Sequence, residues 1–163
     1  MKLRPTLRYR HINDIPIEIL RNMNIRLILA DMDNTLAPWH STEVSQEIIF
    51  WIKEVQNAGI EVLMLTNSKG ENADITARQL GIGVIKDARK PMKKHTRSFL
   101  AQKGVSTEQT LIVGDQLFTD IQLANALGIK SVLLEPLSNR EWWCTKVFNR
   151  SRERLVWPFL FRK

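Results

Sequence analysis

The sequence of 163 residues contains a single cysteine, Cys144. One cysteine cannot form a disulfide within the chain, and it excludes a metal site built from several thiolates, so the composition is typical of a reducing compartment. The sequence also lacks any run of about 18 uncharged apolar residues, the length that a membrane-spanning helix needs. The first residues are basic, but no apolar signal-peptide core follows them. We therefore expect a cytoplasmic protein.

The composition is otherwise that of an ordinary globular protein. Apolar residues make up 44% of the chain and charged residues 25%, which is close to the usual balance. A chain of this length can bury a full core without a disulfide or a structural metal. With no internal repeat or low-complexity segment, we expect a single domain over residues 1–163.

The net charge of +7 is spread unevenly along the chain. Residues 1–11 carry +4, residues 138–163 carry +5, and the part between them carries −2. We interpret residues 1–24 as a basic N-terminal arm and residues 138–163 as a basic tail. The tail also holds six of the twelve aromatic residues, namely Trp142, Trp143, Phe148, Trp157, Phe159 and Phe161. Interleaved bases and aromatics favour contact with an anionic surface, which could be phospholipid, nucleic acid or an acidic partner.

Apolar runs and helical patterns alternate five times along the chain. This alternation predicts an α/β protein with a five-stranded parallel sheet and helices on both of its faces. The strands are expected at 25–30, 60–65, 83–85, 110–113 and 130–134. The helices are expected at 17–23, from a cap at Ser41 or Thr42 to about 57, and at about 70–80, 93–102 and 117–127.

Polar residues gather where these strands end. The first strand runs into Asp31, Asp33 and Thr35, and two carboxylates so close together cannot be buried without partners. The remaining candidates follow the second strand, the third strand and the fourth strand, and they are Thr66, Asn67, Lys90, Gly114, Asp115 and Asp120. In parallel sheets such positions form the functional site where the strand order reverses.

These residue types predict phosphoryl chemistry at a magnesium ion. If the fourth strand lies beside the first, Asp31 and Asp115 become neighbours, and their oxygens suit Mg²⁺. A lysine and a hydroxyl nearby would hold the negative phosphoryl group. Asp31 could then take the phosphoryl group as an aspartyl-phosphate. Asp33 could protonate the leaving oxygen and later deprotonate a water molecule.

In order and spacing, these motifs resemble the haloacid dehalogenase superfamily of aspartate-based phosphatases. The resemblance rests on Asp31-Met-Asp33-Asn-Thr35, Thr66-Asn67, Lys90-Pro91 and the run from Gly114 to Asp120. It implies a Rossmann-like three-layer sandwich in which Asp31 is the nucleophile and a metal ligand. It further implies that Asp33 is the general acid and base and binds metal through its backbone carbonyl, and that Asp115 is a metal ligand. Thr66, Asn67 and Lys90 would bind phosphate, with support from Thr35, Gly114 and Asp120.

Within that superfamily the sequence is similar to the YqeG family of subclass IIIA, which includes phosphatidylglycerophosphate phosphatases. The segments after Thr35 and between Asn67 and Lys90 are too short for a cap domain, so the site should be open. An open site suits a substrate presented on a large surface. The resemblance therefore implies a lipid headgroup phosphate as substrate, with peripheral contact at the inner face of an anionic membrane.

Two other functions remain open from the sequence. The first is a phosphatase for a soluble sugar phosphate or a nucleotide. The second is a non-catalytic protein of ribosome assembly whose basic ends bind RNA, although the complete set of catalytic residue types argues against a nucleic-acid partner. A second copy of the chain could also close the open site, so a homo-oligomer is a further possibility.

Overall fold

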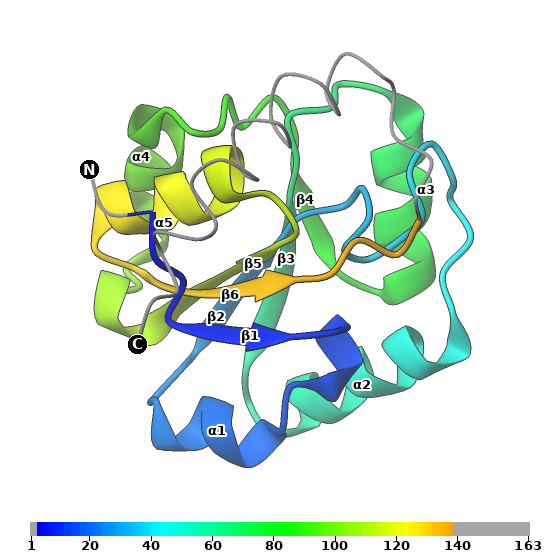
Figure 1. Cartoon of the computed structure of the whole chain (residues 1–163), viewed down its shortest axis with the longest axis horizontal. Coiled ribbons are helices and arrows are strands. Elements are labelled where there is room, and N and C mark those ends of the chain that lie inside the picture. Colours follow the sequence, from blue (N-terminus) through cyan, green and yellow to red (C-terminus); the bar gives the residue numbers. More distant parts are fainter. Residues whose placement is uncertain (1–2, 139–163) are drawn as a thin grey trace.

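A six-stranded parallel sheet forms the centre of the computed structural model, which describes residues 3–138. The sheet order is β1-β6-β5-β2-β3-β4 (Figure 1). The strands are β1 (Leu7–Tyr9), β2 (Leu27–Ala30), β3 (Glu61–Leu65), β4 (Gly83–Ile85), β5 (Thr110–Gly114) and β6 (Lys130–Leu134). The helices are α1 (Ile17–Asn22), α2 (Gln46–Asn57), α3 (Glu71–Leu80), α4 (Lys93–Lys103) and α5 (Gln122–Leu127). Short 3₁₀ turns cover Ile12–Asp14 and Thr107–Gln109, and a π-helical turn covers Leu117–Ile121.

Helices cover both faces of this sheet, as the sequence predicted. Every residue of β2 is buried, and alternate side chains of a strand point to opposite faces. Ile28 therefore belongs to the apolar core under α1, α2 and α3, whereas Leu27 and Leu29 belong to the core under α4 and α5. The two cores make a three-layer sandwich, with α1 and α2 on one side of the sheet and α4 and α5 on the other (Figure 1).

The predicted reversal of strand order is confirmed. β2 pairs with β3 on one side and with β5 on the other. Ala30 lies opposite Val113, so the residues that follow these two strands leave the sheet side by side. The chain between β2 and α2 is a loop, and only α3 and β4 separate Thr66 from Lys90. Neither connection holds a cap domain, which agrees with the expected open site.

The prediction of five strands is wrong by one, because part of the N-terminal arm forms β1. Leu7 pairs with Val132 and Tyr9 with Leu134, in parallel register. Leu7 and Tyr9 are half-buried and Arg8 between them is exposed. These three residues at the sheet edge adopt the strand conformation because they pair with β6, and their own pattern is too short to predict a strand.

Two helix starts also differ from the prediction. Ser45, not Ser41 or Thr42, caps α2 by accepting a hydrogen bond from the Ile48 backbone N–H at 3.4 Å. The Ser41 hydroxyl instead accepts from the Glu43 backbone N–H at 3.0 Å, which closes a local turn. The predicted helix from 117 begins with the π-helical turn, and α5 follows it.

The predicted aromatic tail lies outside the described residues from 139 onward. Within residues 3–138, no helix combines the length and the apolar character needed to cross a membrane.

Candidate active site

Asp31 and Asp33 follow the buried strand β2 and carry different contacts. The Asp31 side chain is buried, and its Oδ1 accepts a hydrogen bond from the Met32 backbone N–H at 2.8 Å. Asp33 is half-buried. Burial raises the pKa of the Asp33 carboxyl and the negative charge of Asp31 adds to that rise, while a hydrogen bond from the His40 backbone opposes it. A raised pKa favours a protonated carboxyl, which is the form that a general acid needs.

Three carboxylates meet beside the end of β2. Asp31, Asp115 and Asp120 are all buried, and each offers an oxygen within 4.8 Å of the others. They come from the ends of β2 and β5 and from the π-helical turn. The predicted proximity of Asp31 and Asp115 is therefore confirmed. An all-oxygen set of buried carboxylates fits a hard divalent cation such as Mg²⁺.

Lys90 places one positive charge among these carboxylates. Its Nζ lies 2.7 Å from Asp31 Oδ1 and 2.7 Å from Asp120 Oδ1, and its side chain is only 3% exposed. Burial disfavours the charged amine, but Asp120 and Asp31 outweigh that effect and raise the pKa of Lys90. Lys90 is therefore cationic at neutral pH and bridges the two acids.

Asp120 is held in place from several sides. Its Oδ2 accepts a hydrogen bond from the Gln116 backbone N–H at 3.3 Å, while Lys90 binds Oδ1. Burial raises the pKa of the Asp120 carboxyl, Lys90 opposes this shift and Asp31 adds to it, which results in a pKa of about 6. Gly114 gives this carboxylate its space, because a Cβ at position 114 would collide with the Asp120 carboxyl group. The two positions therefore pack as a unit.

The two candidates after β3 differ in what their side chains contact. The Thr66 hydroxyl is buried and accepts a hydrogen bond from the Ser68 backbone N–H at 3.1 Å. Asn67 forms a pair of hydrogen bonds with the Lys90 backbone: its Oδ1 accepts from N–H at 2.7 Å, and its Nδ2 donates to C=O at 3.0 Å. Asn67 thus fixes the backbone that carries the Lys90 side chain. Sequence reasoning did not find this contact, because it joins residues of two separate connections.

Thr35 is as fully buried as Asp120. Its side chain is fully buried, and its hydroxyl has no hydrogen-bond partner among the described residues. A buried hydroxyl without a partner is uncommon in folded proteins. It is available as a donor or acceptor in the loop that carries Asp31 and Asp33.

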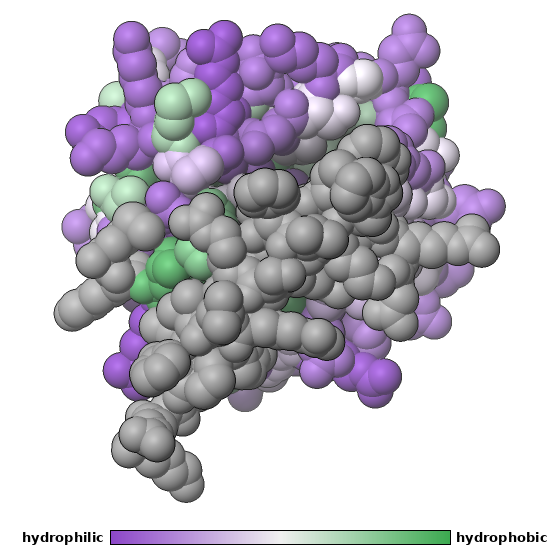
Figure 2. Space-filling model, turned by 45° about the horizontal axis from the view of Figure 1, so that its top comes forward, coloured by the Kyte–Doolittle hydropathy of each residue, from purple (hydrophilic) through white to green (hydrophobic). Residues whose placement is uncertain are grey.

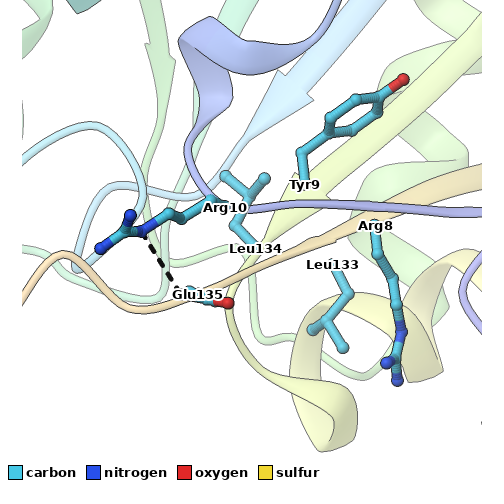
Figure 3. Close-up of a pocket in the computed structure, with 6 residues that line it drawn as sticks. All are labelled: Arg8, Tyr9, Arg10, Leu133, Leu134 and Glu135. Carbon is cyan, nitrogen blue, oxygen red and sulfur yellow. Dashed lines mark ion pairs between the residues drawn. The ribbon is translucent and has the colours of Figure 1, made fainter.

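A separate hollow of about 280 Å³ lies at the edge of the sheet, lined by residues of β1 and β6 and by Arg10 and Glu135, which follow these strands. Figure 3 shows Arg8 and Tyr9 on opposite sides of β1, with Leu133 on the side of Arg8 and Leu134 on the side of Tyr9. Arg10 forms an exposed ion pair with Glu135, whose Oε2 lies 3.7 Å from Nε. None of the candidate site residues lines this hollow, so the carboxylate cluster and the basic sheet edge are distinct features.

The sequence matches the family described as Mitochondrial PGP phosphatase over residues 1–137. The chain belongs to the PGP phosphatase family. The Probable phosphatase YqeG of Bacillus subtilis (strain 168) is 32% identical over 154 residues, which are 94% of this chain and 89% of that protein. This relationship confirms the resemblance to the YqeG family of the haloacid dehalogenase superfamily. As a member of the PGP phosphatase family, the chain is a phosphoric monoester hydrolase.

A more distant relative agrees with this family assignment, and a solved structure shares the fold. The mitochondrial Phosphatidylglycerophosphatase GEP4 of Saccharomyces cerevisiae (strain ATCC 204508 / S288c) is 26% identical over 138 residues, covering 77% of this chain and 74% of that protein. Among solved structures, the cobalt-bound deoxy-D-mannose-octulosonate 8-phosphate phosphatase (YrbI) of Haemophilus influenzae superimposes with a TM-score of 0.56. It is 20% identical and covers 69% of each chain. That likeness shows the shared fold.

Proposed function

We propose that this phosphatase hydrolyses phosphomonoesters through an aspartyl-phosphate on Asp31. The placement of the Asp31 carboxylate carries the proposal. Its Oδ1 is held by Lys90 and by the Met32 backbone. Both of these contacts are to Oδ1, and we propose that the other oxygen, Oδ2, attacks phosphorus. The positive charge of Lys90 also attracts the phosphoryl group to the same place.

Asp33 completes the reaction as the proton carrier. Oδ2 of Asp31 forms a bond to phosphorus as the ester P–O bond breaks, and Asp33 gives its proton to the leaving oxygen. In the second half, Asp33 takes a proton from water, whose oxygen attacks phosphorus, and the bond between phosphorus and Asp31 breaks. Inorganic phosphate leaves and both carboxyl groups return to their starting forms. The raised pKa of Asp33 suits its first step.

We infer that Mg²⁺ binds at Asp31 and Asp115, with the Asp33 backbone carbonyl as a further ligand. Asp120, already bound to Lys90, supports the lysine. When bound, the cation would neutralise negative charge on the phosphoryl oxygens. Thr66 supplies a hydroxyl near the phosphate, while Asn67 acts on Lys90.

Metal removal tests this assignment. Chelation with EDTA should abolish phosphate release, and added Mg²⁺ should restore it. Asp115→Asn removes one carboxylate charge, so it should raise the Mg²⁺ concentration needed for half-maximal rate by about tenfold or more. Asp14→Asn changes an exposed acid outside the cluster and serves as the control. Full activity of the wild type in EDTA would contradict the metal proposal.

For the substrate, we propose phosphatidylglycerophosphate, whose dephosphorylation yields phosphatidylglycerol. The family match and the name of the yeast relative support this choice. The open site supports it as well, because no inserted domain stands between the described site residues and a large surface. A soluble sugar phosphate or nucleotide is the alternative.

The first turn of α4 supports contact with an anionic membrane. Lys90 reaches into the site, and two residues later Met92 is 57% exposed. Lys93 and Lys94 follow, both exposed, and the first turn of α4 contains no acid. Lysines at a helix N-terminus are repelled by the positive end of the helix dipole. Lipid phosphates near them would offset this repulsion by attracting the lysine charges. In Figure 2, hydrophilic residues gather along the upper part of the described surface.

The substrate assay follows directly. We expect the protein to release phosphate from phosphatidylglycerophosphate in mixed micelles at least tenfold faster, in kcat/KM, than from soluble sugar phosphates and nucleotides. A tenfold ratio corresponds to about 1.4 kcal/mol of differential transition-state binding. We also expect a faster reaction in anionic than in zwitterionic micelles. Faster turnover of any soluble ester would overturn the lipid assignment, and equal rates in both micelles would overturn the membrane contact.

A further inference from the structure

Asn34 lies directly after Asp33 and connects the catalytic loop to the far end of the described chain. Its side-chain Oδ1 accepts two hydrogen bonds from Ser138, one from the hydroxyl at 2.7 Å and one from the backbone N–H at 3.2 Å. The Asn34 backbone C=O accepts a third from the Leu137 backbone N–H at 3.1 Å. These contacts join residues that are about a hundred positions apart in the sequence.

Asn34 is buried and has a backbone conformation that few residue types adopt. The residue is 1% exposed and has a φ of +59°, in the left-handed region that few side chains adopt. Its own N–H donates to the Ala37 carbonyl at 2.7 Å, which closes the loop after Asp33. A buried amide oxygen must be hydrogen-bonded, and Ser138 supplies both of its donors.

The segment 135–138 is itself anchored at its other end. The Glu135 backbone N–H donates to the Arg10 carbonyl at 3.1 Å, so the segment continues the pairing of β6 with β1. Leu137 packs against the apolar core on the side of α2. The segment therefore runs from the sheet edge to the catalytic loop, with fixed contacts along its length.

From this geometry we propose that Asn34 is a positioning residue and that the segment 135–138 acts through it to orient the Asp33 carboxyl group. The inference rests on the proposed function, because it takes Asp33 as the acid that protonates the leaving oxygen. Asn34 does not contact the reacting atoms. It fixes the backbone that follows Asp33, while Ser138 fixes Asn34.

If Asn34 positions Asp33, a change at Asn34 should lower kcat/KM more for esters whose leaving oxygen needs a proton than for esters whose leaving group does not. Alkyl phosphates need a proton on the leaving oxygen, whereas p-nitrophenyl phosphate has a leaving group stable enough to depart without one. Because kcat/KM reports only the steps up to departure of the leaving group, it isolates the acid role of Asp33. Asn34→Gly keeps the left-handed backbone and removes the amide. We expect it to lower kcat/KM for an alkyl phosphate about tenfold, and for p-nitrophenyl phosphate less than about threefold.

Ser138 provides a second test of the same contact. Ser138→Ala removes one of the two donors to Asn34. We expect it to lower kcat/KM for the alkyl ester about threefold and to change kcat/KM for p-nitrophenyl phosphate less. Ser138→Thr keeps the hydroxyl and should restore the wild-type ratio. The double variant Asn34→Gly/Ser138→Ala should have the same kcat/KM for the alkyl ester as Asn34→Gly alone, because the Ser138 hydroxyl acts only through the Asn34 amide.

Two reference variants, Asp33→Asn and Ser45→Ala, distinguish an error in the role of Asp33 from an error in the role of Asn34 and from a loss of stability. Asp33→Asn should show the largest dependence on the leaving group; if it shows none, the proposed role of Asp33 fails. If Asp33→Asn shows it and Asn34→Gly lowers both esters equally, only the positioning role is overturned. Ser45→Ala removes the cap of α2, so it lowers stability without changing the ratio between the two esters. Thermal unfolding of each variant identifies any loss of folded protein.

Discussion

Replacing Asp31 by asparagine is expected to lower the rate of phosphate release by at least about a thousandfold. The amide has nearly the same size and shape as the carboxylate, but it cannot form a covalent bond to phosphorus. It also cannot carry the negative charge that pairs with Lys90 at 2.7 Å. Both effects act on the reacting centre, so the loss appears in kcat and is not recovered at high substrate concentration.

Acid quenching during turnover distinguishes a lost nucleophile from a damaged fold. The wild type should retain labelled phosphate on the protein after the quench, whereas Asp31→Asn should retain none. Asp14→Asn is the matched control, because it makes the same chemical change at an exposed acid. Labelled phosphate on Asp31→Asn at the wild-type level would show that another residue takes the phosphoryl group.

The second large effect is on stability and comes from Lys90→Met. Methionine fills a similar volume, but the variant leaves Asp31 and Asp120 buried without their shared cation. Removing one partner of a buried ion pair typically costs about 3–5 kcal/mol. We expect a loss of that size in the free energy of unfolding, measured by urea denaturation in metal-free buffer at neutral pH, together with loss of activity.

The chain offers a matched control for this measurement. Lys86 lies four residues earlier and pairs with Asp74 at the same distance, 2.7 Å, but both side chains are 35% exposed. An exposed pair contributes about 1 kcal/mol or less, so Lys86→Met should change the free energy of unfolding by no more than that. Equal losses in the two variants would show that burial does not set the strength of the Lys90 contacts.

The sequence was sufficient to predict the two central strands and the carboxylates that follow them. A buried strand followed by two aspartates, and a second strand followed by Gly114 and Asp115, predicted neighbouring strand ends, and the structure brings their carboxylates together. The positions of these carboxylates can be predicted because the carboxyl ends of parallel strands lie on the same edge of the sheet. The local patterns of β2 and β5 are strong, since both strands are buried along their whole length.

Other features depended on contacts between distant segments. β1 exists because β6 offers it a partner, and its three residues carry too short a pattern to predict. Asn67 was interpreted as a phosphate ligand, but its amide is bonded to the Lys90 backbone. The role of Asn34 was not predicted, because its partner Ser138 is far away in the sequence and lies beyond the last strand. The available signal was the asparagine within the motif from Asp31 to Thr35, because asparagine tolerates a left-handed backbone.

The contact between Gly114 and Asp120 has a consequence for how such sites evolve. A side chain at position 114 would occupy the space of the Asp120 carboxyl group, and without that carboxylate Lys90 loses one of its two anions. A mutation at position 114 therefore damages the site even though glycine itself has no chemical group to contribute. We therefore expect substitutions at position 114 to be tolerated only together with a change at Asp120.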